Sequence, residues 1–258
     1  MTGLRYVYAV CRPLGAPLQA DLSGVAGDPP RLLNHHGLIA VVSHVPERDF
    51  AQEPLRARLD DLDWRTETAR VHQQVIDALT AVTTPLPLRP ATVFRDDSGV
   101  RVMMEEREDD FRHTLDRLTG RVEWGVKVYV EGETREAERA QRAERFAERL
   151  HTRLSAHAED TCLHTAQGQP PQGQPPQGQP PQGQLPQGRN VLDAAYLVPR
   201  AASEEFVEIV DRANGEESGM RVELTGPWAA YSFVDSAMDS SMELSLEPVV
   251  ESAEGPRI

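Results

Sequence analysis

Apolar residues along the first 120 positions alternate between short runs and helical stripes. Two β-branched runs, residues 4–11 and 38–45, are bounded by turn residues and predict strands. Between them, residues 12–30 carry the prolines and glycines of a loop. Asp63 can cap a helix that runs to about Val82, because one apolar stripe follows it at helical spacing. This stripe consists of Trp64, Thr68, Val71, Val75, Leu79 and Val82.

The pattern continues with a short strand over residues 86–94 and a helix over residues 100–118, which Gly120 ends. It then restarts with strands at residues 121–131, 194–198, 220–224 and 229–234, and with helices at residues 134–157 and after a Ser203 cap. Both halves mix strands with helices that cover one face of a mostly antiparallel sheet, which is an α+β pattern. We therefore predict two small α+β domains, residues 1–120 and 121–235.

Two segments fall outside this pattern. Residues 167–188 repeat Gln, Gly and Pro with a period of five, a composition that offers little to bury. We interpret this repeat as a disordered insertion in a surface loop of the second domain. Residues 236–258 form an acidic tail in which Met242, Leu244 and Leu246 alternate with polar residues. Addition of this tail to a sheet edge and a solvated tail both stay open.

The composition limits the classes of function. The 27 Lys and Arg against 41 Asp and Glu give a net charge of −14, whereas nucleic acids require clustered basic residues. No apolar run reaches the roughly 18 residues of a membrane-spanning helix, and the first residues do not resemble a secretion signal. Cys11 and Cys162 fit a reducing compartment better than a disulfide framework. We expect a cytoplasmic protein with no nucleic-acid partner and no lipid membrane as partner.

No complete catalytic constellation is found along the chain. The phosphate-binding and nucleophile motifs are absent, and Lys127, the only lysine, lies on a predicted half-buried strand. His72 lies beside the apolar stripe of its helix, where a hydrogen-bonded residue at the edge of the core is the favoured interpretation. Paired with Asp61 or Asp63, it is the candidate for acid–base chemistry. We expect no catalytic residue and no cofactor.

The histidines do not show the spacing of metal ligands either. His36 and His44 lie about 26 Å apart if the chain between them is extended, too far to share one ion. A second group lies beside the repeat but has no paired CxxC or HxxxH motif. It consists of His157, Asp160, Cys162 and His164. We expect no metal site.

Several segments stand out by their order and spacing. They read LDDLDWRTETARVHQQVIDAL and PLPLRPATVF (residues 59–79 and 85–94), GRVEWGVKVYVE (120–131), and AAYLVPR and LTGPWAAYSFV (194–200 and 224–234). Together they resemble the gas vesicle protein F/L family, and the resemblance covers residues 4–234. The sequence departs from the family pattern where Pro90 and Ala91 replace an aromatic residue and a glycine. It departs again where Ala229 and Ala230 replace two prolines.

The resemblance implies a non-enzymatic function in assembly. Members of this family are expected to have two modified ferredoxin-like α+β domains and to act in forming gas vesicles. The implied partner is the major shell protein GvpA, with other vesicle accessory proteins as further candidates. The implied location is the cytoplasm and the vesicle wall, and we expect the F-like rather than the L-like branch.

The first domain is expected to present the shell-protein surface. Trp64, Arg89 and Phe94 lie in family-matching segments and are the candidate contacts, although their favoured role is structural. Core or interdomain packing is expected for Trp124, Trp228, Tyr231 and Phe233. Two alternatives stay open, namely a scaffold that recruits partners through the repeat and the tail, and an enzyme that uses His72 with a nearby carboxylate.

Overall fold

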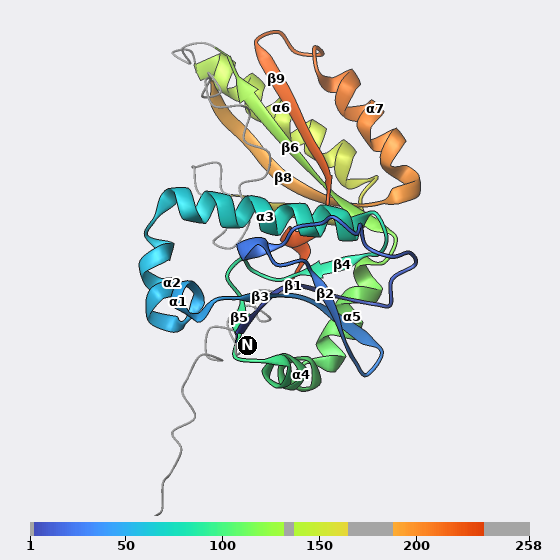
Figure 1. Ribbon diagram of the computed structural model, residues 1–258. Coiled ribbons are helices and arrows are strands. Elements are labelled where there is room, and N and C mark those ends of the chain that lie inside the picture. The colour runs from blue at the N-terminus through green and yellow to red at the C-terminus, as the bar shows by residue number, and fades with distance from the viewer. Residues whose placement is uncertain (1–2, 132–136, 165–187, 235–258) are drawn as a thin grey trace, which may run out of the picture.

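Two antiparallel sheets organise the chain in the computed structural model, which describes residues 3–131, 137–164 and 188–234 (Figure 1). The predicted tail and the repeat, apart from Gly188, lie outside the described residues. The α+β class predicted from the sequence is confirmed, because each sheet packs against helices. Helix α3 lies across the region between the two sheets (Figure 1).

The first sheet has the strand order β2-β3-β1-β4, and β5 also pairs with β1. Its strands are β1 (Leu4–Cys11), β2 (Arg31–His35), β3 (Leu38–Val45), β4 (Pro85–Pro87) and β5 (Val93–Phe94). β1 and β3 coincide with the predicted strands. The strand predicted over residues 86–94 is instead two short strands. β2 was not predicted, because Leu33 is its only buried residue and no alternation marks it.

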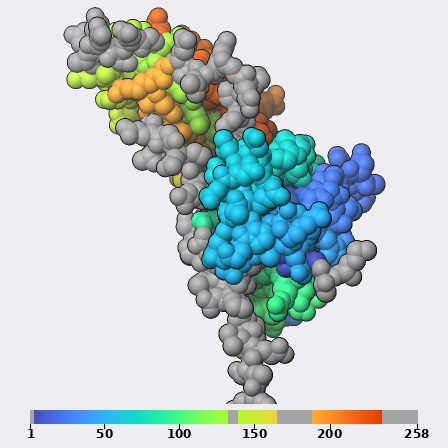
Figure 2. Space-filling view, turned by 60° about the vertical axis from the view of Figure 1, so that its left-hand side comes forward, coloured from blue at the N-terminus to red at the C-terminus, as the bar shows by residue number. Residues whose placement is uncertain are grey.

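Helices cover both faces of the first sheet, not one face as predicted. Tyr6 and Tyr8 of β1 pack toward α1 (Glu47–Phe50), α2 (Gln52–Leu59) and α3 (Leu62–Thr80). Val7 and Val10 pack on the opposite side toward α4 (Asp97–Glu106) and α5 (Glu108–Leu118). The residues of α1 to α3 form a broad blue-to-cyan surface on this half (Figure 2). The first sheet is therefore the middle layer of three.

Helix α3 begins earlier than predicted. Asp61 precedes it in an extended conformation, and its carboxylate accepts hydrogen bonds from the N–H groups of Asp63 (3.1 Å) and Trp64 (3.2 Å). Asp61 is thus the N-cap, and the prediction of Asp63 was wrong by two residues. Either aspartate satisfies the sequence preference for a cap, so composition alone does not distinguish them.

The helix predicted over residues 100–118 is two helices, α4 and α5, that meet at Arg107. The first begins before residue 100 because the Asp96 carboxylate accepts from the N–H groups of Ser98 and Gly99, both at 2.9 Å. At Arg107 the backbone leaves the helical region, with φ −125° and ψ 21°. The break lets both helices follow the same face of the sheet.

The second sheet has the strand order β7-β8-β6-β9 and is covered on one face by two helices. Its elements are β6 (Arg121–Val130), α6 (Ala137–Ser155), β7 (Asp160–Leu163), β8 (Arg189–Pro199), α7 (Ser203–Ala213) and β9 (Met220–Trp228). As the alternation predicted, Trp124, Val126 and Val128 point toward the helices. Ser203 is the first residue of α7 and makes no cap hydrogen bond, so its predicted capping role was wrong.

Two parts of the second half differ from the prediction. β7 was not predicted, because none of its four residues is fully buried and no apolar pattern marks it. Residues 229–234 do not form a strand, but contain a 3-10 turn at Tyr231–Phe233. This segment leaves the second sheet and reaches the first half of the chain.

Candidate functional site at the junction of the two sheets

Residues 229–234, which we call the C-terminal clasp, join the two halves of the protein. Ala229 and Tyr231 pack with the core between the first sheet and α3. Ala230 and Phe233 pack instead with Leu118 of α5 and with two residues of β8. The clasp therefore completes apolar clusters that contain residues from both halves.

A buried carboxylate fixes the clasp. Glu123 of β6 is 1% exposed, and its two oxygens accept hydrogen bonds of 2.8 Å from the backbone N–H and the hydroxyl of Ser232. Arg117 of α5 donates to the carbonyl oxygen of Phe233 on the same turn. A buried carboxylate is tolerated only where hydrogen bonds replace its hydration, so Glu123 and Ser232 depend on each other.

The backbone before the clasp explains one glycine of the TGPW segment. Gly226 has φ +117°, and a Cβ atom added there would lie 2.8 Å from the carbonyl oxygen of Glu123. A side chain at this position would clash with the backbone of β6, so the close approach requires glycine. The EWGVK and TGPW segments thus meet at Glu123.

Two further polar contacts cross the junction. The Arg200 guanidinium donates to the carbonyl oxygen of Thr80 at the end of α3 (3.0 Å). Arg117 of α5 forms an ion pair with Asp160 of β7, with an N–O distance of 3.5 Å. These exposed contacts contribute less than the buried Glu123 interaction, because water screens them.

The candidate catalyst His72 lies in the core, not at its edge. Its ring is fully buried, and its Nδ1 atom is 3.0 Å from the hydroxyl of Tyr6, which accepts the N–H of Ala91. Burial lowers the pKa of His72 to about 3, so the ring is neutral near neutral pH. Asp61 and Asp63 lie roughly 14 Å or more along α3 from His72. The structure does not assemble the acid–base pair that these residues would need.

The three candidate contact residues do not form one surface. Trp64 lies on the first turn of α3, half-buried, with its ring 5.5 Å from that of Phe50. Phe94 is buried on the opposite side of the first sheet, among residues of α4. Arg89 is half-buried in the turn after β4, where its carbonyl oxygen accepts the hydroxyl of Thr92 (2.7 Å).

The histidines and cysteines have separate surroundings. His36 lies 2.8 Å from a carboxylate oxygen of Glu108, whereas His44 lies 3.0 Å from the Arg31 guanidinium. Cys11 is buried, and burial raises the pKa of its thiol to about 12. Among the residues that the structure describes, no group of three or more His, Cys, Asp or Glu side chains is placed to hold a metal ion.

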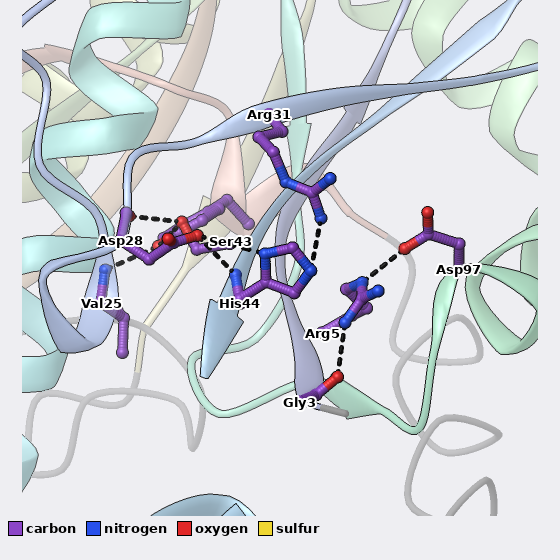
Figure 3. Close-up of polar contacts among 9 residues, drawn as sticks. Gly3, Arg5, Val25, Asp28, Arg31, Ser43, His44 and Asp97 are labelled. Carbon is purple, nitrogen blue, oxygen red and sulfur yellow. Dashed lines mark hydrogen bonds and ion pairs between the residues drawn. The ribbon is translucent and has the colours of Figure 1, made fainter. Parts of the chain in front are cut away.

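A polar network ties the loop before β2 to the first sheet (Figure 3). The hydroxyl of Tyr8 accepts the N–H of Val25 (2.7 Å) and donates to Ser43 (3.0 Å), whose hydroxyl donates to the carbonyl oxygen of Asp28 (2.9 Å). The Asp28 carboxylate accepts the N–H of His44 (2.9 Å). These bonds fix the chain where it enters β2.

The fold and the junction define a two-sheet α+β protein whose innermost polar groups support packing. A family model described as "Gas vesicle synthesis protein GvpL/GvpF" matches residues 4–138 and 131–235. The chain belongs to this family. None of the helices within the described ranges has the length and hydropathy that a membrane-spanning helix needs.

Individual relatives agree with this assignment. Gas vesicle protein L of Streptomyces sp. (strain CB03234) is 47% identical, in an alignment that covers 93% of this chain and 96% of the relative. Gas vesicle protein F of the same strain is 26% identical over 89% of this chain and 99% of its own length. The crystal structure of gas vesicle protein GvpF from Anabaena sp. PCC7120 superposes with a TM-score of 0.63 at 16% identity, over 90% of this chain and 98% of that chain.

The comparison corrects the predicted branch. We expect an F-like protein from the sequence segments, but 47% identity to a protein L against 26% to a protein F indicates an L-like chain. The prediction of the F-like branch was therefore wrong. The scaffold alternative relies on the repeat and the tail, which lie outside the described residues apart from Gly188.

The segments of the junction are visible in the sequence, but the residues that connect them are not. Tyr231 and Phe233 are predicted as packing residues, and both pack at the junction. Glu123 and Ser232 are not predicted to interact. A signal was present, since Glu123 is a carboxylate two residues into a strand of mostly apolar and small residues. Its partner, however, is 109 positions away, and no local pattern indicates it.

Proposed function

We propose that this chain is a non-enzymatic accessory protein of gas vesicle assembly that binds the major shell protein GvpA. In this function it supports nucleation or growth of the vesicle wall, and it acts in the cytoplasm and at the wall. The observation that carries the proposal is the 47% identity to a gas vesicle protein L over 93% of the chain. The burial of Glu123 and His72 in structural hydrogen bonds supports a function in binding rather than in catalysis.

We propose that the first half carries the shell-protein surface. Four of the five large, exposed apolar side chains among the described residues belong to this half. They are Leu32, Leu59, Leu62 and Val102, whereas Leu163 belongs to the second half. Exposed apolar side chains are the natural contacts for a hydrophobic partner. Trp64 and Arg89 are half-buried and stay candidate contacts, whereas the buried Phe94 contributes by packing.

The test is retention of co-expressed GvpA on the tagged full-length chain. Leu32 and Leu163 form a matched pair, because both lie on edge strands and are 41% and 62% exposed. We expect Leu32→Asp to reduce the retained GvpA about fivefold or more, because a charge replaces an apolar contact. Leu163→Asp should leave retention unchanged.

Failure of the unmodified chain to retain GvpA would contradict the proposed function. Loss of retention in Leu163→Asp alone would leave the function standing, but would move the surface to the second half. Circular dichroism and the midpoint of thermal unfolding establish that each variant is folded.

A further inference from the structure

The two sheets have four edges, and three of them carry features that limit pairing with another strand. β4 contains two prolines, which have no N–H to donate. In β7 the N–H of Thr161 is bonded to the Asp160 carboxylate (2.8 Å). In β9 the N–H of Val222 donates to the side-chain oxygen of Asn214 (3.3 Å). Proteins use such features to prevent edge-to-edge association.

The edge formed by β2 carries no such protection. Its turn residues, His36 and Gly37, have φ of 47° and 78°, as in the type I′ turn of a two-residue hairpin to β3. The residues that flank such a turn, His35 and Leu38, exchange backbone hydrogen bonds. Along the two strands, pairs with hydrogen bonds then alternate with pairs without them. Leu32 and Asn34 therefore direct their N–H and C=O groups away from β3. Within the described ranges, no residue bonds to these groups.

Charges of both signs surround β2, but Arg31 on β2 itself has no acidic side chain within ion-pair distance among the described residues, whereas Arg5 is paired with Asp97 and His44 lies 3.6 Å from Asp28. Arg31 contacts His44 at 3.0 Å and Arg5 contacts Asp97, both on the side of the sheet that faces α4 (Figure 3). The pKa of His44 is lowered first by burial and then by the charges of Arg31 and Arg5, which outweigh the opposite effects of Asp28 and Asp97. The pKa of Asp97 is lowered mainly by its hydrogen bond with Arg5, and also by the charges of Arg31 and Arg101. An acidic side chain that lies beside β2 can therefore form an ion pair with Arg31.

We propose that the outer edge of β2 binds an extended segment of the shell protein in which acidic side chains alternate with apolar ones. This inference rests on the proposed function and assigns the backbone that makes the contact. The segment joins the first sheet as an additional strand, with hydrogen bonds to Leu32 and Asn34. Its acidic side chains lie near Arg31, and its apolar side chains cover the exposed Leu32.

The backbone contact is tested by Asn34→Pro in the full-length chain. Proline removes the outward N–H but no hydrogen bond to β3, so the hairpin is retained, as in natural edge strands. We expect about tenfold less retained GvpA, the loss from roughly 1.4 kcal/mol of hydrogen bonding. Asn34→Thr is the matched control, because it changes the same side chain but keeps the N–H, and its retention should equal that of the unmodified chain.

The charge contribution is tested by Arg31→Glu. We expect about three- to tenfold weaker retention at low salt, and convergence with the unmodified chain near 1 M salt, where the screening length is about 3 Å. Arg212→Glu is the control, since it reverses an exposed charge on α7 in the second half. It should leave retention unchanged at both salt concentrations.

Hydrogen exchange gives a second readout that needs no variant. The amides of Leu32 and Asn34 should exchange at least about tenfold more slowly in the complex, because a new strand bonds to this edge.

Unchanged exchange at both amides would overturn the proposal. Equal retention of GvpA by Asn34→Pro and Asn34→Thr, while the unmodified chain binds GvpA, would also overturn it. A concentration-dependent dimer that Asn34→Pro abolishes without GvpA would also overturn it, since the occupant would then be a second copy. If the unmodified chain does not bind GvpA at all, the proposed function itself is contradicted.

Discussion

In the first half of the chain, helices pack on both faces of the sheet, whereas α6 and α7 pack on one face of the second sheet. The other face of the second sheet contacts the clasp near Ala195 and Leu197. Farther along it carries ion pairs, including Lys127 with Asp193 at 3.2 Å. Buried apolar clusters thus hold the two halves together. Among the described residues, no helix packs on the polar part of this face, which we call the open face of the second sheet.

The comparison also shows that the two halves are not equally self-contained. The apolar cluster between the second sheet and its helices is built from residues 122–222. The cluster between the first sheet and α3 includes Ala229 and has Tyr231 packed against it, from the far end of the described chain. The first half therefore needs the clasp for its full packing. The domain boundary at residue 120 stays a prediction.

The largest effect is expected when a buried aromatic ring of the clasp is removed. Phe233→Ala should lower the free energy of unfolding by about 4 kcal/mol, because it deletes a ring that packs against both halves. Urea unfolding of the full-length chain measures this change. Leu163→Ala is the control, since that side chain is mostly exposed and should change stability by less than about 0.5 kcal/mol. Equal effects of the two substitutions would contradict the packing role of the clasp.

A slightly smaller effect is expected at the carboxylate that binds the clasp. Glu123→Ala should cost about 3 kcal/mol, because the N–H and hydroxyl of Ser232 lose a charged acceptor in a buried position. Glu223→Ala on the exposed part of the same sheet should cost less than about 1 kcal/mol. Urea unfolding of both variants gives the comparison, and a loss below 1 kcal/mol for Glu123→Ala would show that the clasp does not depend on it.

Acid should destabilise the first half through His72. Its pKa is about 3 in the folded protein and 6.5 when unfolded, so only the unfolded chain binds this proton between these values. The contribution of His72 to stability is thus complete above pH 6.5 and decreases as the pH falls toward 3. At pH 4.5 the loss is about 3 kcal/mol. His72→Gln should remove this part of the pH dependence in urea unfolding from pH 7 to 4.5, and an identical slope in both proteins would contradict the assignment.

The smallest effect is expected on the open face of the second sheet. Lys127→Ala should change the free energy of unfolding by less than about 1 kcal/mol, because its ion pair with Asp193 is partly exposed and screened. Thermal unfolding at low and high salt measures this contribution. A loss comparable to that of Glu123→Ala would show that the open face stabilises the protein as much as the junction does.

The sequence predicted those elements whose pattern is local. The β-branched runs of β1 and β3 are buried, and the apolar side chains of β6 alternate toward its helices. The residues of each strand therefore indicate that strand without reference to its partners. The edge strands β2 and β7 bury at most one side chain each, and a pattern of burial does not reveal them. β7 depends on pairing with β8, whose first residue lies 26 positions after the last residue of β7. β2 pairs with the adjacent β3 across the turn at His36 and Gly37, but this turn lacks the Asn-Gly or Asp-Gly pair that marks a hairpin most strongly in a sequence.

The junction was predictable in part, because some of its features depend on the chemistry of single residues and others on contacts between distant positions. Apolar side chains such as Phe233 are expected to be buried wherever they lie, so their packing role follows from their chemistry. The interaction of Glu123 with Ser232 depends on a contact between positions 109 apart. The apolar residues of the clasp predict a strand, but they form a 3-10 turn, because burial at a junction produces a similar apolar pattern.

The clasp completes the core of the first half by packing Ala229 and Tyr231 against it. Hydrogen exchange of the full-length chain with Tyr231→Ala, compared with the unmodified chain, tests it most directly. We predict faster exchange in β1 and α3, which pack against Tyr231, and unchanged exchange in α6 and α7. Unchanged exchange in β1 and α3, or faster exchange confined to α6 and α7, would contradict the claim.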